Sequence, residues 1–189
     1  TQVVMIPNTP IETDDIICEN YLRTSKFRAS GFDGFMQDYV FLSRDRVVPI
    51  FQGINPNVAA FTELITISMH ALTRFDKKAH MRRNVFGIWG DGNLGYITAL
   101  LLKEMYINSK IIVFGKNSHK LSHFSFVDEV FLIDQIPEYI LLDHVFECVG
   151  GKGSQFAINQ AIDYVQPEGT ISILGVSEYP VEINTRMIL

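Results

Sequence analysis

Hydrophobic residues in the second half of the chain come in short runs that are rich in β-branched side chains. The runs lie at Val85–Trp89, Ile111–Phe114, Val130–Ile133, Val145–Val149 and Thr170–Leu174. They are continuous rather than alternating, which is typical of parallel strands that helices cover on both faces. Helical periodicity occupies the stretches near 94–106 and 154–165, and Gln166–Gly169 is predicted to end the second helix and turn into the last strand. This order predicts an α/β fold with a doubly wound parallel sheet.

The first half has a different pattern, with short β-type segments and a polar stretch between them. Strands are predicted at Val3–Ile6, at 34–40 and at Val47–Val48, where Pro49 ends the last one. The polar stretch from Asn8 to Ser30 is predicted to be a long surface loop with one helical turn. Asn55 followed by Pro56 indicates a helix start, and apolar spacing extends that helix to about Thr73.

Composition and charge narrow the classes of protein. The chain has 189 residues, 47% of them hydrophobic and 20% charged, with a formal net charge of −5. Because no stripe of lysine or arginine is present, nucleic acid is not expected as a partner. No apolar run is long enough to cross a membrane, and two cysteines cannot form a disulfide framework, so the cytoplasm is the predicted compartment. Both ends of the chain fall inside predicted elements, and we expect it to be part of a longer protein.

The most informative motif is Gly90-Asp91-Gly92-Asn93-Leu94-Gly95, which follows the run Val85–Trp89 and opens a helix. In a strand–turn–helix unit, the first glycine permits the tight turn, the second admits a diphosphate and the third lets helix and sheet pack closely. The helix start supplies free N–H groups for the anion. The motif predicts a dinucleotide site, and the alternative is a glycine-rich connection that binds nothing.

The end of the second predicted strand bears on which dinucleotide is bound. An acidic residue about 20 positions after the glycines usually holds the ribose 2′-hydroxyl of NAD, and here that position is Gly115, followed by Lys116 and Lys120. Glycine leaves room and lysine supplies charge for a 2′-phosphate, so NADP is favoured, unless these lysines are merely solvated. The missing acid also argues against a methyltransferase. Residues predicted to bind the coenzyme are Gly90, Gly92, Asn93, Leu94, Gly95, Gly115, Lys116, Lys120, Val149, Gly150, Gly175 and Val176.

Three further segments resemble the medium-chain zinc-dependent alcohol and polyol dehydrogenases. They are the strand-like run from Gly31 to Tyr39, the helix around Ala59–Leu64 with His70, and Phe146–Gly151. The resemblance implies a partial, β-rich GroES-like catalytic domain at 1–54, a connecting helix and linker at 55–84, and a Rossmann dinucleotide-binding domain at 85–189 that is incomplete at its C-terminal end. It implies an NADP-dependent dehydrogenase in which Glu63 lies near or on a catalytic zinc, whereas catalytic residues stay unknown.

A narrower resemblance is to bacterial ribulose-5-phosphate reductases, on Val3–Asn8, Ser30–Met36, Gly90–Gly95 and 175–179. It implies NADPH-dependent reduction of D-ribulose 5-phosphate to D-ribitol 5-phosphate, for CDP-ribitol and then wall teichoic acid or capsule. It also implies a small sugar phosphate as substrate, and it is compatible with a homodimer and with a complex with a cytidylyltransferase. The usual cysteine and histidine zinc ligands would lie upstream of Thr1, so we expect this stretch alone to bind metal poorly and to lack activity.

Two alternatives stay open. A zinc-free NADPH quinone or enone reductase has the same fold, and Glu63 argues only mildly against it. A non-catalytic nucleotide-binding module would keep the fold without the chemistry. Glu63 itself has a second interpretation, as a carboxylate in the first turn of a helix that pairs with a surface base.

Overall fold

The computed structural model describes residues 1–30, 32–177 and 179–188. Gly31 and Glu178, which belong to the motifs of the resemblance, and Leu189 lie outside the described residues. The chain divides into two compact units, an N-terminal unit at Thr1–Thr62 and a sheet unit at Glu63–Leu189. This division is geometric, and the assignment of 1–54, 55–84 and 85–189 to three functional parts stays a prediction.

Short antiparallel pairs build the N-terminal unit. Strand β1 (Val3–Met5) pairs with β4 (Val47–Pro49), and β2 (Asn8–Thr9) pairs with β3 (Lys26–Phe27). Two 3-10 turns at Glu19–Tyr21 and Arg44–Arg46 and the short helix α1 (Pro56–Ala59) complete it. Among its described residues no hydrophobic side chain is fully buried, and polar contacts of Glu19 with Arg46 (2.6 Å) and Asn8 (3.0 Å) tie its segments together.

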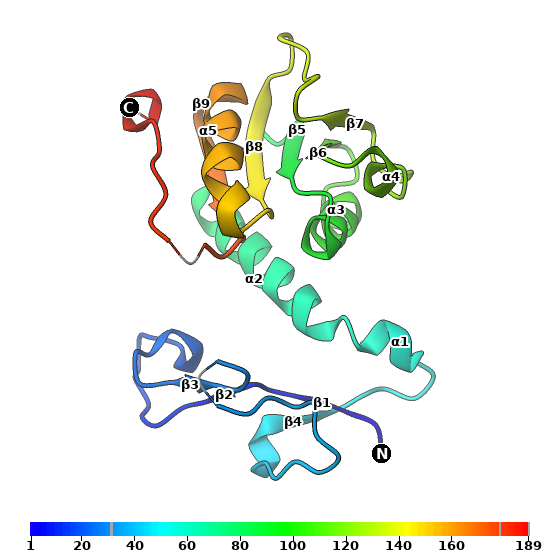
Figure 1. Cartoon of the computed structure of the whole chain (residues 1–189), viewed down its shortest axis with the longest axis vertical. Coiled ribbons are helices and arrows are strands. Elements are labelled where there is room, and N and C mark those ends of the chain that lie inside the picture. The colour runs from blue at the N-terminus through cyan, green and yellow to red at the C-terminus, as the bar shows by residue number, and fades with distance from the viewer. Residues whose placement is uncertain (31, 178, 189) are drawn as a thin grey trace. The chain divides into compact units, whose positions relative to one another are not determined.

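A five-stranded parallel sheet organises the other unit (Figure 1). Its strands are β5 (Val85–Trp89), β6 (Lys110–Gly115), β7 (Glu129–Leu132), β8 (Leu142–Glu147) and β9 (Val165–Ile173). They lie in the order β7-β6-β5-β8-β9, so the direction of winding reverses between β5 and β8. Ligands of such sheets bind beyond the carboxyl ends of the strands at that reversal. The predicted doubly wound parallel sheet is confirmed.

Helices cover both faces of the sheet, which explains why the strand runs are continuously apolar. On one face, α2 (Thr62–Lys78), α3 (Asn93–Met105) and the short α4 (Ser118–Leu121) pack on the sheet through Phe75, Leu102 and Leu121. On the other face, α5 (Ser154–Tyr164) packs through Ala157 and Ala161. Strand residues alternate between the two cores, as Ile88 and Trp89 do in β5.

The last segment of the chain returns along α5. After β9, residues 174–177 and 179–184 belong to no helix or strand, and a 3-10 turn follows at Thr185–Ile188. Asn159 of α5 donates to the carbonyl of Glu182 (2.8 Å) and accepts from the backbone N–H of Asn184 (2.8 Å). These hydrogen bonds tie the segment to one helix of the sheet unit, and Figure 1 shows its orange-to-red trace beside α5.

Several local predictions were wrong at their ends or in type. The segment 34–40 is not a strand, and Asn8–Ser30 holds a small antiparallel pair instead of a plain loop. The helix that begins after Asn55 breaks at Ala60–Phe61 and resumes as α2, which runs five residues past Thr73 to Lys78. Residues 166–169 lie inside β9, where the register with β8 shifts between Leu142 and His144.

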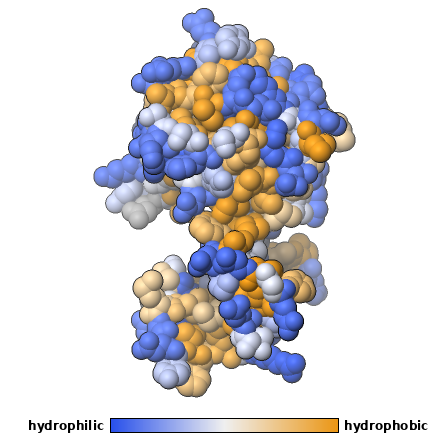
Figure 2. Space-filling view, turned by 90° about the vertical axis from the view of Figure 1, so that its right-hand side faces the viewer, coloured by the Kyte–Doolittle hydropathy of each residue, from blue (hydrophilic) through white to orange (hydrophobic). Residues whose placement is uncertain are grey.

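Hydrophobic side chains reach the surface in both units (Figure 2). In the N-terminal unit the most exposed include Ile16, Met36, Phe41 and Phe51, each more than 80% exposed. Scattered apolar side chains are normal on protein surfaces. Among the described residues, none of the helices combines the length and the hydrophobicity needed to cross a bilayer.

Candidate functional site

The turn between β5 and α3 has the geometry that its three glycines predict. Gly90 has a φ of +132°, which only glycine adopts readily, and a side chain at Gly95 would collide with the carbonyl oxygen of Gly90. Gly92 differs from both, because a Cβ there would meet nothing within 4 Å. Neither backbone strain nor packing within the described residues requires a glycine at 92, so the space in front of it is free for a ligand.

Helix α3 begins at this turn with its N–H groups open. Gly92 is its N-cap residue, and no side chain of the described residues caps the first turn. Uncapped N–H groups and the positive end of a 13-residue helix dipole suit a phosphate group.

The neighbouring turn, which follows β6, is fastened to the glycine turn by Asp91. One carboxylate oxygen, Oδ2, accepts hydrogen bonds from the backbone N–H groups of Lys116 and Asn117, both at 2.8 Å. Gly115 packs directly against this side chain, since a Cβ at 115 would lie 2.7 Å from the Cβ of Asp91. The room that Gly115 was predicted to leave for a ligand is therefore partly filled by Asp91.

A third turn follows β8 and is held by Glu147. This carboxylate is fully buried, and its Oε1 accepts from the backbone N–H groups of Val149 (2.9 Å) and Gly150 (3.1 Å). Oε2 has no hydrogen-bond partner among the described residues. A side chain at Gly175 would collide with the backbone nitrogen of Gly150, so the ends of β8 and β9 are in close contact. Glu147 thus fixes the loop that follows β8.

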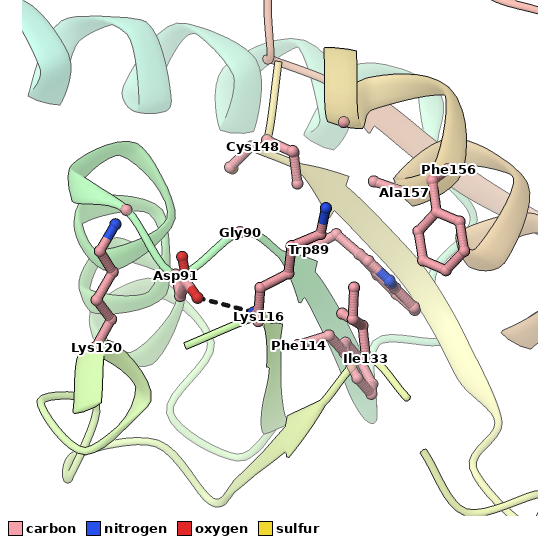
Figure 3. A pocket seen from close by; sticks show the side chains of 14 residues that line it. Trp89, Gly90, Asp91, Phe114, Lys116, Lys120, Ile133, Cys148, Phe156 and Ala157 are labelled. Carbon is pink, nitrogen blue, oxygen red and sulfur yellow. Dashed lines mark hydrogen bonds between the residues drawn. The ribbon is translucent and has the colours of Figure 1, made fainter. Parts of the chain in front are cut away.

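A pocket of about 230 Å³ opens where these turns meet (Figure 3). Six of the residues predicted to bind the coenzyme line it: Gly90, Gly92, Gly115, Lys116, Lys120 and Val149. The other six do not line it: Asn93, Leu94, Gly95, Gly150, Gly175 and Val176. The geometry brings half of the predicted set to one cavity, and a role in binding stays a prediction for all of them.

Sequence reasoning missed the apolar part of the pocket wall. Trp89 and Phe114 stack with ring centroids 4.1 Å apart, and Ile133, Phe156 and Ala157 also line the cavity. The indole N–H of Trp89 donates to Gln160 (2.8 Å), which keeps the ring fixed. Their positions near the carboxyl ends of β5 to β7 and the start of α5 are the signal that could have identified them.

Charge in the pocket comes from Asp91 and two lysines. Figure 3 shows Asp91 between Lys120 and Lys116, with a dashed line for its hydrogen bond to the backbone of Lys116. Cys148 also lines the wall, but burial raises the pKa of its thiol to about 12, so the sulfur is neutral near pH 7. Cys148 is only 8% exposed and packs in one of the two cores as a small residue.

Glu63 is not part of a metal-binding cluster among the described residues. This residue lies exposed in the first turn of α2. Among the described residues no group of three or more histidine, cysteine, aspartate or glutamate side chains is placed to hold a metal ion. The side chains present therefore do not fit a zinc ion, and Glu63 as a metal ligand stays a prediction for the whole protein.

Comparison with known proteins gives strong similarities, although no family model matches the chain. The Staphylococcus aureus protein named ribulose-5-phosphate reductase 1 is 63% identical over 189 residues, which is 100% of this chain and 55% of that protein. The crystal structure of S. aureus TarJ in complex with NADPH is 62% identical, with a TM-score of 0.77 over 82% of this chain and 49% of that chain.

A more distant structure shows the fold alone. Galactitol-1-phosphate dehydrogenase from Escherichia coli is 16% identical and has a TM-score of 0.79, over 98% of this chain and 56% of that chain. The chain spans about half the length of the curated relatives it matches.

Proposed function

We propose that the whole protein reduces D-ribulose 5-phosphate to D-ribitol 5-phosphate with NADPH. The premise is that the chain belongs to the ribulose-5-phosphate reductases of the medium-chain dehydrogenase family. The product would serve CDP-ribitol formation, and through it wall teichoic acid or capsule. The observation that carries the proposal is the pocket at the carboxyl ends of β5 and β6, which is lined by the glycine turn and by two lysines of the neighbouring turn.

The residues of the pocket fit NADPH in three ways. The free space at Gly92 and the uncapped start of α3 would receive the diphosphate. Lys116 and Lys120 would pair with the 2′-phosphate. The apolar wall, in which Ile133 and the half-exposed Phe156 reach the cavity, would pack against a flat ring. When bound, NADPH supplies the hydride of the reduction.

The assay that tests the proposal uses the full-length protein. We expect NADPH oxidation with ribulose 5-phosphate, slower oxidation with xylulose 5-phosphate, and little with unphosphorylated ribulose. Equal rates with ribulose and its 5-phosphate would contradict the sugar-phosphate assignment. Coenzyme binding without turnover of any ketose phosphate would favour a non-catalytic nucleotide-binding module.

Coenzyme choice is tested at Lys116. Changing Lys116 to Asp replaces a favourable charge with a repulsive one beside the proposed 2′-phosphate, so the dissociation constant for NADPH should rise by about tenfold or more. The constant for NADH should change little. The matched control is Lys77→Asp, at an exposed position in the last turn of α2. An unchanged NADPH preference in Lys116→Asp would show that this lysine is merely solvated.

Three further predictions concern the whole protein. Metal analysis should find zinc, and its absence together with activity on enones would indicate a zinc-free reductase of the same fold.

Light scattering after size exclusion, with and without a cytidylyltransferase, tests the homodimer and the complex. The cytoplasm is the proposed location, because the proposed coenzyme and a phosphorylated sugar are intracellular metabolites and both cysteines are free thiols.

A further inference from the structure

Asp91 lies at a position of the pocket that the proposed function leaves unexplained. An enzyme that prefers NADPH gains nothing from a carboxylate close to a 2′-phosphate, because like charges repel. Asp91 lines the same cavity as Lys116 and Lys120. Its presence there therefore calls for a role other than a direct contact with the phosphate.

The hydrogen bonds of Asp91 indicate that role. A single oxygen, Oδ2, accepts from the backbone N–H groups of both Lys116 and Asn117. Asn117 in turn caps α4, because its side chain accepts from the backbone N–H of Lys120 (3.1 Å). A continuous set of hydrogen bonds thus connects the glycine turn to the backbone of both lysines.

Packing at position 115 reinforces the same arrangement. A Cβ at 115 would lie 2.7 Å from the Cβ of Asp91 and 2.8 Å from its Oδ2. Asp91 in its present place and a side chain at 115 are therefore mutually exclusive. Asp91 fills the space that an acidic side chain at position 115 would need. An acidic residue at the end of this strand is the one that would select NAD.

We propose that Asp91 is a positioning residue for coenzyme selection, which acts by holding the backbone of 116–117 so that Lys116 and Lys120 face the 2′-phosphate. This inference rests on the proposed function, and it assigns the selectivity of the site to a hydrogen-bond acceptor as well as to the lysines. Asp91 makes no direct contact with the 2′-phosphate in this scheme.

Two substitutions separate the acceptor from the charge. In Asp91→Asn, the amide oxygen can accept from both N–H groups, because the native oxygen Oδ2 does so alone. In Asp91→Ala, both hydrogen bonds are lost. Asp163→Asn, at an exposed position of α5, is the control for the loss of one negative charge.

The measurement is calorimetric titration of NADPH and NADH into the full-length protein. In Asp91→Ala the dissociation constant for NADPH should rise by about tenfold or more, and the constant for NADH by less than about threefold. Asp91→Asn should keep NADPH binding within about threefold of the parent. Rescue by asparagine together with a change of coenzyme ratio is a result that a merely structural role would not produce.

Three results would overturn the inference: an unchanged NADPH-to-NADH ratio in Asp91→Ala, tighter NADPH binding in that variant, or a loss in Asp91→Asn as large as in Asp91→Ala. If Asp91→Ala does not fold, Gly115→Ala decides, since its Cβ displaces Asp91 and should weaken NADPH selectively. A parent protein that binds no NADPH would refute the proposed function itself, which is a separate outcome.

Discussion

His144 is buried in β8 and uses both ring nitrogens. The backbone N–H of Thr170 donates to Nδ1 (3.1 Å), so Nε2 carries the proton and donates to the carbonyl of Arg82 (2.9 Å). Burial, followed by the charge of the neighbouring His80, lowers the pKa of His144 from 6.5 to about 4, against the opposing effects of the Arg82 carbonyl and the Asp143 carboxylate. The folded protein therefore keeps this ring neutral near pH 7.

That neutral ring predicts a loss of stability on acidification. Between pH 6.5 and about 4 the unfolded chain binds a proton that the folded chain does not, so the free energy of unfolding falls as the pH falls. The contribution of the neutral His144 ring to the free energy of unfolding is complete above pH 6.5. Its loss as the pH falls to about 4 amounts to about 3 kcal/mol. Urea unfolding between pH 7.5 and 4.5 should show a shallower pH dependence for His144→Gln than for the parent. The exposed His119→Gln is the control, and an equal slope in His144→Gln would contradict the assignment.

The roles of some single residues could be predicted from the sequence, and those of others could not. The roles of Gly90 and Gly95 follow from local turn geometry, and the structure agrees with both. The role of Asp91 could not be predicted from the motif, because its partners are backbone groups 25 and 26 residues away. Such a contact depends on how two turns meet across a sheet, and periodicity contains no information about that.

Among the elements, β9 departs most from its sequence pattern. Val165 pairs with Leu142, and the next paired residue is Thr170 opposite His144, so the segment 166–169 bulges out of the ladder. Glu168 has a φ of +65°, and a Cβ at Gly169 would lie 2.6 Å from the carbonyl oxygen of Asp143. The pattern of Gln, Pro, Glu and Gly predicted a turn ahead of the strand, whereas these residues form a bulge inside β9.

The bulge predicts opposite effects for two neighbouring substitutions. Gly169→Ala forces a methyl group against backbone and should lower the free energy of unfolding by about 1–3 kcal/mol. Glu168→Gly removes a side chain from a left-handed conformation and should leave stability unchanged or raise it by up to about 1 kcal/mol. Thermal and urea unfolding measure both, and a destabilisation by Glu168→Gly as large as that by Gly169→Ala would refute this account.

Elements with strong local signals were predicted well, and those decided by tertiary contacts were not. The parallel strands and α3 and α5 agree within a few residues for most of their ends, since continuous apolar runs and helical spacing specify them. The segment 34–40 is aromatic but has no partner strand among the described residues, so its β propensity is not realised. The break at Ala60–Phe61 lies just before the boundary of the two units, which falls between Thr62 and Glu63, and it has no sequence signal.

At the scale of the whole molecule, the site is made of three turns that lie far apart in the sequence and meet at one edge of the sheet. These are the turns at 90–95, 115–120 and 148–153. The opposite edge carries Arg82, Asp143 and Gln166, whose side chains form hydrogen bonds with one another. Nε of Arg82 lies 2.6 Å from Oδ1 of Asp143. A ligand of the pocket should therefore slow backbone exchange at the first edge more than its general stabilisation of the fold slows exchange elsewhere.

Hydrogen exchange of the full-length protein with saturating NADPH tests this arrangement. Peptides covering 90–95, 115–120 and 148–153 should be protected together, because one ligand would order three turns, and ligand at about 100 times its dissociation constant stabilises a protein by about 2.7 kcal/mol. Peptides covering 82–84 and 166–169 serve as internal controls and should not change beyond the general effect. NADH should protect 90–95 more than 115–120, since it lacks the phosphate that the lysines would hold. Protection confined to the opposite edge would place the ligand elsewhere.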